Sequence, residues 1–148
     1  MHRFVASFAG IGLLPARLRG DHAGAGTVGS LAAAIIAWAI DGSLLVDLAL
    51  IAAAIALSLW AAAPFAAGGE DPGWVVIDEV AGTFVATAGL AGWPLLAGLV
   101  VFRLADIWKA VPGVGRAERL PGALGVTADD LVAGCYGLAA GLILAWIS

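Results

Sequence analysis

The chain has 148 residues, of which 62% are hydrophobic and only 12% are charged, and its mean hydropathy is +1.02. Soluble domains do not have this composition, so we expect residues 1–148 to form a single integral membrane domain. Acidic residues outnumber basic ones by eleven to seven. The resulting net charge of −4 argues against a nucleic-acid partner, which binds to a strongly basic face.

Three apolar segments occupy the first half of the chain. Residues 4–14 are too short to cross a bilayer, and we expect an interfacial or re-entrant helix there. Residues 27–40 and 44–67 would form helices of ~21 Å and ~36 Å at 1.5 Å per residue. Asp41-Gly42-Ser43 between them is typical of a turn. The two segments are therefore predicted to form an antiparallel hairpin.

The second half of the chain contains an uncharged run at residues 80–102 that has the length of one crossing. The breaker cluster Gly89-Leu90-Ala91-Gly92-Trp93-Pro94 interrupts it, so we expect two short helices, 79–91 and 95–109. Residues 131–147 form the last predicted crossing. The predicted fold is an all-α, polytopic membrane helix bundle of about five short crossings plus the N-terminal interfacial or re-entrant helix.

The distribution of basic residues predicts the orientation of the bundle. With the N-terminus in the cytoplasm and the 80–102 run split, all seven bases fall on or near the cytoplasmic face, as the positive-inside rule requires. They are Arg3, Arg17, Arg19, Arg103, Lys109, Arg116 and Arg119. The C-terminus is then expected outside.

Four polar segments converge on the cytoplasmic side in this topology. Residues 26–30 open the first crossing, Asp78-Glu79 opens the third, and Asp129-Asp130 opens the fifth. Arg103-x-x-Asp106-x-x-Lys109 closes the fourth, and its i, i+3, i+6 spacing places these side chains on one helix face. Thr127-x-x-Asp130 also fits a capping box at the start of the last helix.

Closely placed carboxylates beside a bilayer repel one another, so either their pKa values rise or a cation lies among them. Mg²⁺ suits oxygen ligands and commonly joins carboxylates to a substrate phosphate. A glycine-flanked Thr or Ser at a helix start can bind phosphate, and Arg103 and Lys109 could neutralise its charge. Together these groups indicate phosphoryl chemistry.

Each of these features also has a structural reading. Asp78-Glu79 would complement a helix dipole, Arg103 and Asp106 would form an intrahelical ion pair, and Asp129-Asp130 would cap a helix. The functional reading depends on all four segments meeting at one face of the membrane.

At these residues the sequence resembles the phosphatidylglycerophosphatase A family. Four segments carry the resemblance, in family order: residues 26–33, 76–82, 102–109 and 125–134. Three positions depart from the family pattern, namely Ala25 and Ala110 in place of proline and Glu118 in place of aspartate.

The resemblance implies a Mg²⁺-dependent phosphatase of the bacterial inner membrane, multi-pass and with its site facing the cytoplasm. It would convert the phospholipid phosphatidylglycerophosphate to phosphatidylglycerol. The implied metal ligands are Asp78, Glu79, Asp106, Asp129 and Asp130; the implied catalytic acids are Asp78, Asp106 and Asp129; the implied phosphate-binding residues are Thr27, Ser30, Arg103 and Lys109.

Two other functions stay open at this stage. A non-enzymatic helical membrane subunit could use its acids as an ion or proton pathway, which predicts acids at several membrane depths. Another lipid head-group phosphotransferase is the second alternative, although the chain lacks the Asp-Gly-x-x-Ala-Arg core of the CDP-alcohol phosphatidyltransferases. For a phosphatase, attack by a metal-activated water and an aspartyl-phosphate route are both compatible with the sequence.

Overall fold

The computed structural model describes residues 1–40, 43–66 and 72–148. These residues form helices and no strand, which confirms the predicted all-α fold. In chain order the elements are α1 (His2–Ala6), η1 (Ile11–Leu13), α2 (Leu14–Arg19), α3 (Ala25–Ile40), α4 (Leu44–Ala62), α5 (Ile77–Thr87), α6 (Gly92–Trp108), α7 (Val114–Ala117) and α8 (Ala123–Ile147).

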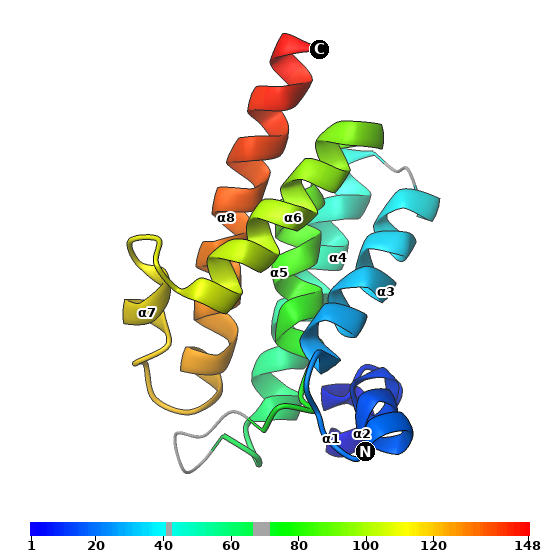
Figure 1. Ribbon diagram of the computed structural model, residues 1–148, viewed down its shortest axis with the longest axis vertical. Helices are drawn as coiled ribbons and strands as arrows, with labels where there is room; N and C mark the ends of the chain where they lie inside the picture. The colour runs from blue at the N-terminus through cyan, green and yellow to red at the C-terminus, as the bar shows by residue number, and fades with distance from the viewer. Residues whose placement is uncertain (41–42, 67–71) are drawn as a thin grey trace.

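Helix α5 lies in the middle of the bundle and contacts α3, α4, α6 and α8 (Figure 1). Most of its eleven residues are buried, as a helix surrounded by four others requires. The long helices alternate in direction, so α5 and α8 run parallel and both begin at the lower end of the view in Figure 1. Helices α5 and α6 form the hairpin predicted from the breaker cluster, and a single helix over 80–102 is excluded.

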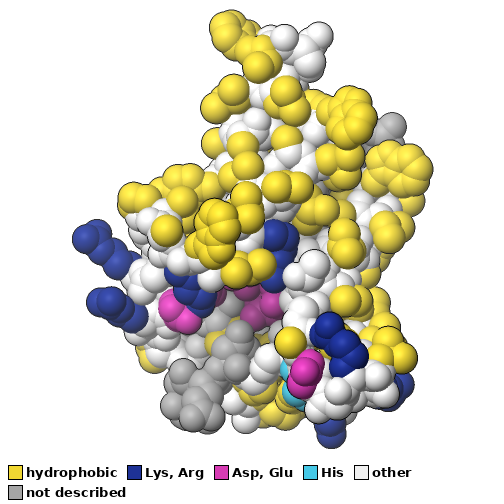
Figure 2. All heavy atoms as spheres, viewed as in Figure 1, with side chains coloured by type: hydrophobic (Ala, Val, Ile, Leu, Met, Phe, Trp, Pro, Cys, Tyr) yellow, Lys and Arg dark blue, Asp and Glu magenta, His cyan; other side chains and the backbone are white. Residues whose placement is uncertain are grey.

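Two helices, α4 and α8, are long and apolar enough to cross a membrane. Apolar side chains cover the upper part of the face in Figure 2, whereas acidic and basic side chains gather over its lower part. Helices α3, α5 and α6 contain 16, 11 and 17 residues. The predicted number of crossings therefore stays a prediction.

Small residues allow α5 and α8 to approach closely. A Cβ atom on Gly82 would lie 2.8 Å from the carbonyl oxygen of Asp130, and one on Gly134 would lie 2.6 Å from the carbonyl oxygen of Gly82. Asp78 and Asp130 each precede one of these glycines by one helical turn. Because the two helices are parallel, this contact brings both carboxylates to the same level of the bundle.

The last helix begins earlier than the sequence indicated. Helix α8 starts at Ala123, directly after Gly122 with φ +59°, instead of at residue 131. Thr127 therefore lies inside the helix, where its hydroxyl is hydrogen-bonded to that of Ser58 at 2.7 Å. The predicted capping box at Thr127-x-x-Asp130 is wrong.

Two other boundaries differ from the predictions. The expected single helix over 4–14 is replaced by α1, η1 and α2, because Phe8, Ala9 and Gly10 have φ values of +48°, +56° and +90° that interrupt a helix. Helix α4 ends at Ala62, shortly before Pro64, instead of continuing to residue 67. Asp41 and Gly42 of the predicted turn, and the predicted helix end at residue 67, lie outside the described residues.

Candidate active site

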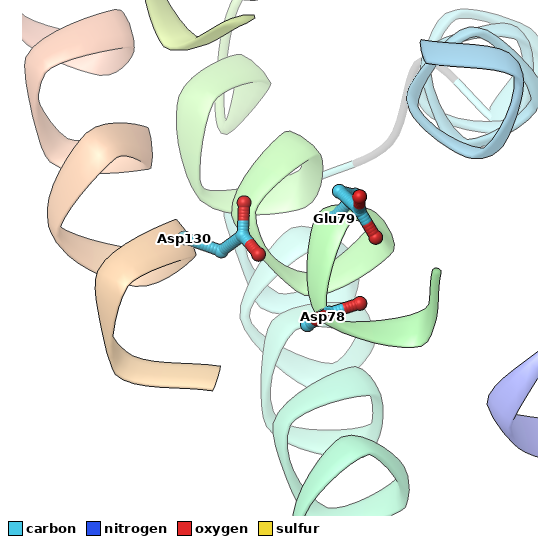
Figure 3. Close-up of side chains that lie close together, drawn as sticks. All are labelled: Asp78, Glu79 and Asp130. Atoms are coloured by element: carbon cyan, nitrogen blue, oxygen red, sulfur yellow. The ribbon is translucent and has the colours of Figure 1, made fainter. Parts of the chain in front are cut away.

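Three carboxylates meet at the lower end of the bundle. Asp78 and Glu79 lie in the first turn of α5, and Asp130 lies in the second turn of α8 (Figure 3). One oxygen atom from each residue lies within 4.8 Å of the other two. Asp78 and Asp130 are almost fully buried, at 1% and 4% exposure. We call Asp78, Glu79 and Asp130 the acidic triad.

The start of α3 forms one wall of this site. A Cβ atom on Gly26 would overlap the Glu79 Oε1 atom and would lie 3.1 Å from the Arg103 Nη2 atom. Glycine at position 26 therefore makes the room that these two side chains occupy. Ser30 lies one turn further along the same helix face, where it is buried and its hydroxyl has no hydrogen-bond partner among the described residues. Thr27, by contrast, has an exposed side chain.

Helix α6 contributes an ion pair next to the triad. Arg103 Nη1 lies 2.7 Å from Asp106 Oδ2, and both side chains are 14% exposed, so the intrahelical pair expected from their i, i+3 spacing forms. The charges of both residues act on Glu79 and Asp130. The Nε atom of Arg103 is buried without a hydrogen-bond partner in the described part of the chain. Arg103 thus brings a positive charge and an unused donor to the edge of the triad.

Lys109 lies in a second polar cluster. It ends α6 with φ +49°, and its ammonium group contacts Glu118 and lies 3.0 Å from Asp129 Oδ2. Partial burial opposes the Lys109 charge, but the hydrogen bonds and negative charges of Glu118 and Asp129 outweigh it and raise the pKa of the ammonium. Lys109, Glu118 and Asp129 form what we call the lysine cluster.

A sequence model of the phosphatidylglycerophosphatase A family matches residues 4–145. The chain belongs to this family. Its members are phosphoric monoester hydrolases, so the protein is an enzyme of that class, as the resemblance in the sequence indicated.

Two relatives of the chain are named as phosphatases of two different lipids. A putative phosphatidylinositol-3-phosphatase of Bacteroides thetaiotaomicron is 33% identical over 135 residues, which cover 82% of this chain and 84% of that protein. Phosphatidylglycerophosphatase A of Escherichia coli is 36% identical over 70 residues, which cover 45% of this chain and 41% of that protein. No solved structure matches the chain.

The acidic triad has the properties of a cation site. The Glu79 Oε2 and Asp130 Oδ1 atoms are buried and have no hydrogen-bond partner among the described residues. Buried anionic oxygens without donors are unfavourable, and a hard cation such as Mg²⁺ or Ca²⁺ binds such oxygens well. The triad could therefore bind a metal ion.

The structure groups the predicted site residues in a way that the sequence did not indicate. Of the five acids in the predicted ligand set, three form the triad, whereas Asp106 pairs with Arg103 and Asp129 pairs with Lys109. Sequence reasoning gave no role to Glu118 and did not recognise Gly26 as the residue that makes room for Glu79. The only local signal for Gly26 was its position in a glycine-rich helix start.

Proposed function

We propose that the protein hydrolyses the terminal phosphate monoester of phosphatidylglycerophosphate, giving phosphatidylglycerol and inorganic phosphate. The observation that carries this proposal is the buried acidic triad at the charged end of an apolar bundle, in a member of the phosphatidylglycerophosphatase A family. In a lipid phosphate the acyl chains lie in the bilayer and the phosphate lies at its surface. The protein is divided in the same way, with the charged site at one end of an apolar bundle.

The proposed cofactor is Mg²⁺, held by Asp78, Glu79 and Asp130. When bound, it would neutralise phosphate oxygens and favour attack by water at phosphorus. We assign Asp106 and Asp129, the remaining acids of the predicted set, to positioning Arg103 and Lys109, because the structure pairs them with these bases.

The chain's own residues perform the remaining steps of the proposed reaction. Arg103 neutralises the phosphate through its guanidinium group, and the Ser30 hydroxyl donates to a phosphate oxygen. Their burial excludes bulk water and strengthens both interactions. Water supplies the oxygen that replaces the glycerol oxygen on phosphorus, and the glycerol oxygen leaves with a proton.

Metal dependence is tested by removing the ion. We expect EDTA to abolish phosphate release from phosphatidylglycerophosphate by the purified protein and Mg²⁺ to restore it. Mg²⁺ should also raise the melting temperature of the wild-type protein but not of Asp130→Asn, because only an intact triad binds the ion. Full hydrolysis in EDTA would contradict the metal assignment.

Attack by an aspartate would pass through a covalent phosphoenzyme. Direct attack by water transfers the phosphoryl group to water in one displacement and leaves the protein unmodified at every time point. An aspartyl-phosphate route leaves a transient phosphoryl group on Asp78, Asp106 or Asp129, which rapid acid quenching and mass spectrometry of peptides would detect.

A phosphoinositide is the second candidate substrate. A relative that aligns with 82% of the chain is named a putative phosphatidylinositol-3-phosphatase, and both lipids present a phosphate monoester to the membrane surface. We expect the larger kcat/KM with phosphatidylglycerophosphate. A larger value with phosphatidylinositol 3-phosphate would reverse the assignment while leaving the site unchanged.

We also propose a cytoplasmic site in the bacterial inner membrane, with five crossings. The test uses Cys135→Ser, since Cys135 is exposed, together with either Ser43→Cys at the upper end or Arg116→Cys at the lower end. A membrane-impermeant maleimide should label Ser43→Cys in intact spheroplasts and Arg116→Cys only after lysis. The opposite pattern would place the site outside.

A further inference from the structure

An apolar groove of about 340 Å³ separates α3 from α6 above the acidic triad. These two helices contact each other sparsely, unlike α6 and α8, which pack along their lengths. All residues that line the groove are apolar: Leu31, Ala34, Ile35 and Trp38 from α3, and Gly92, Leu95, Leu96 and Leu99 from α6.

The lower end of the groove lies next to the site. Helices α3 and α6 run in opposite directions and meet where Gly26 lies beside Arg103. Directly above this point, Leu31 follows Ser30 in α3, and Leu99 precedes Arg103 by one turn of α6. The groove then continues over two turns of each helix, roughly 10 Å, to Trp38 and Gly92. The lining of the groove therefore ends one residue from Ser30 and one helical turn from Arg103.

A second opening, beside the lysine cluster, has a lining that is partly charged. A cavity of about 430 Å³ is lined in part by Lys109, Glu118, Arg119 and Asp129. An acyl chain in this cavity would desolvate several charged groups, which is unfavourable. Water and released phosphate suit this opening, whereas a hydrocarbon chain suits the α3–α6 groove.

We propose that the α3–α6 groove binds one acyl chain of the lipid whose phosphate monoester occupies the site. This inference rests on the proposed function, because it requires a lipid substrate. The chain would leave the site past Leu31 and Leu99 and lie along the two helices toward Trp38. Since bilayer lipid is as apolar as the groove, the groove orients the substrate and selects chains that fill it, with little gain from hydrophobic transfer.

Narrowing the groove tests this inference. Leu31→Trp and Leu96→Trp each place a larger side chain in the groove, from opposite walls. Leu142→Trp is the matched control, because Leu142 lies on α8 away from the groove and is 52% exposed, close to the 51% of Leu31. The substrates are dioleoyl and dihexanoyl phosphatidylglycerophosphate, which share a headgroup and differ in chain length.

We expect each groove variant to raise KM for the dioleoyl lipid about tenfold, or about 1.4 kcal/mol, with kcat changed less than about twofold. KM for the dihexanoyl lipid should change less than about twofold, and Leu142→Trp should change neither value. Equal effects on both lipids, or an equal effect of Leu142→Trp, would overturn the acyl-chain assignment alone. Wild-type protein inactive on both lipids would overturn the proposed function as well.

Discussion

Asp129 and Asp130 are adjacent in the chain, but they lie in different surroundings. Asp130 belongs to the acidic triad, and its buried Oδ1 atom has no hydrogen-bond partner among the described residues. Asp129 points to the lysine cluster, where Lys109 lies 3.0 Å from its Oδ2 atom. Successive residues of an α-helix differ in direction by about 100°, so one position along α8 separates the two clusters.

This difference indicates two roles for the acids of the site. A carboxylate paired with a lysine is stabilised by the protein itself and contributes to folding. Three carboxylates gathered within 4.8 Å of one another, as in the triad, repel one another, and a bound cation relieves this repulsion. Residues of the second kind are therefore expected to affect activity much more than stability, and residues of the first kind to affect both moderately.

The largest effect is expected from Asp130→Asn. Loss of one negatively charged carboxylate from the triad should lower kcat/KM for phosphatidylglycerophosphate about a thousandfold, equivalent to about 4 kcal/mol. The melting temperature in EDTA should stay the same or rise, because repulsion within the triad is reduced. Phosphate release and thermal unfolding measure the two quantities. An active Asp130→Asn protein would exclude the triad as the metal site.

A smaller loss is expected from Gly26→Ala. The added methyl group overlaps the end of the Glu79 side chain, which can rotate away, so the fold should persist while kcat/KM falls roughly 10- to 100-fold. Higher Mg²⁺ concentrations should recover part of the activity. Gly115→Ala is the control, because its Cβ would meet nothing closer than the Lys109 carbonyl oxygen at 3.9 Å. Equal activity of the two variants would contradict the role of Gly26.

Local sequence signals predicted the main elements of the fold. Glycine and proline at 89–94 determine the backbone of their own segment, so the α5–α6 hairpin follows from residues within that segment. The start of α8 could not be derived in this way. Thr127 has the spacing of a cap, but its hydroxyl is hydrogen-bonded to Ser58, which is 69 positions away in the sequence.

The spacing of the acids along the chain also could not predict that they divide into two clusters. The sequence indicated which helix ends carry acids, and three of these acids do meet. Which of them faces α5 depends on the rotation of α8 about its own axis. The contact between Gly82 and Gly134 sets that rotation, and it is a tertiary contact.

An intermediate effect is expected from Asp129→Asn. Lys109 keeps Glu118 as a partner, so we expect about a tenfold loss of kcat/KM and a loss of stability of about 1 kcal/mol, seen as a lower melting temperature. Combining it with Lys109→Met should give less than the sum of the two single effects, because the two residues contact each other. If Asp129→Asn were instead as inactive as Asp130→Asn and were no longer stabilised by Mg²⁺, Asp129 would be a metal ligand.

The smallest effect is expected from Asp47→Ala at the opposite end of the bundle. Its Oδ2 atom accepts a hydrogen bond from the Gly89 backbone N–H at 2.9 Å, which fixes the turn between α5 and α6. We expect a loss of stability of about 0.5–1 kcal/mol and kcat/KM within twofold of the wild-type value. Asp47→Asn keeps an acceptor oxygen and should restore the melting temperature. A well-folded Asp47→Ala protein with little activity would mean that acids at both ends of the bundle act together, as an ion or proton pathway requires and a single surface site does not.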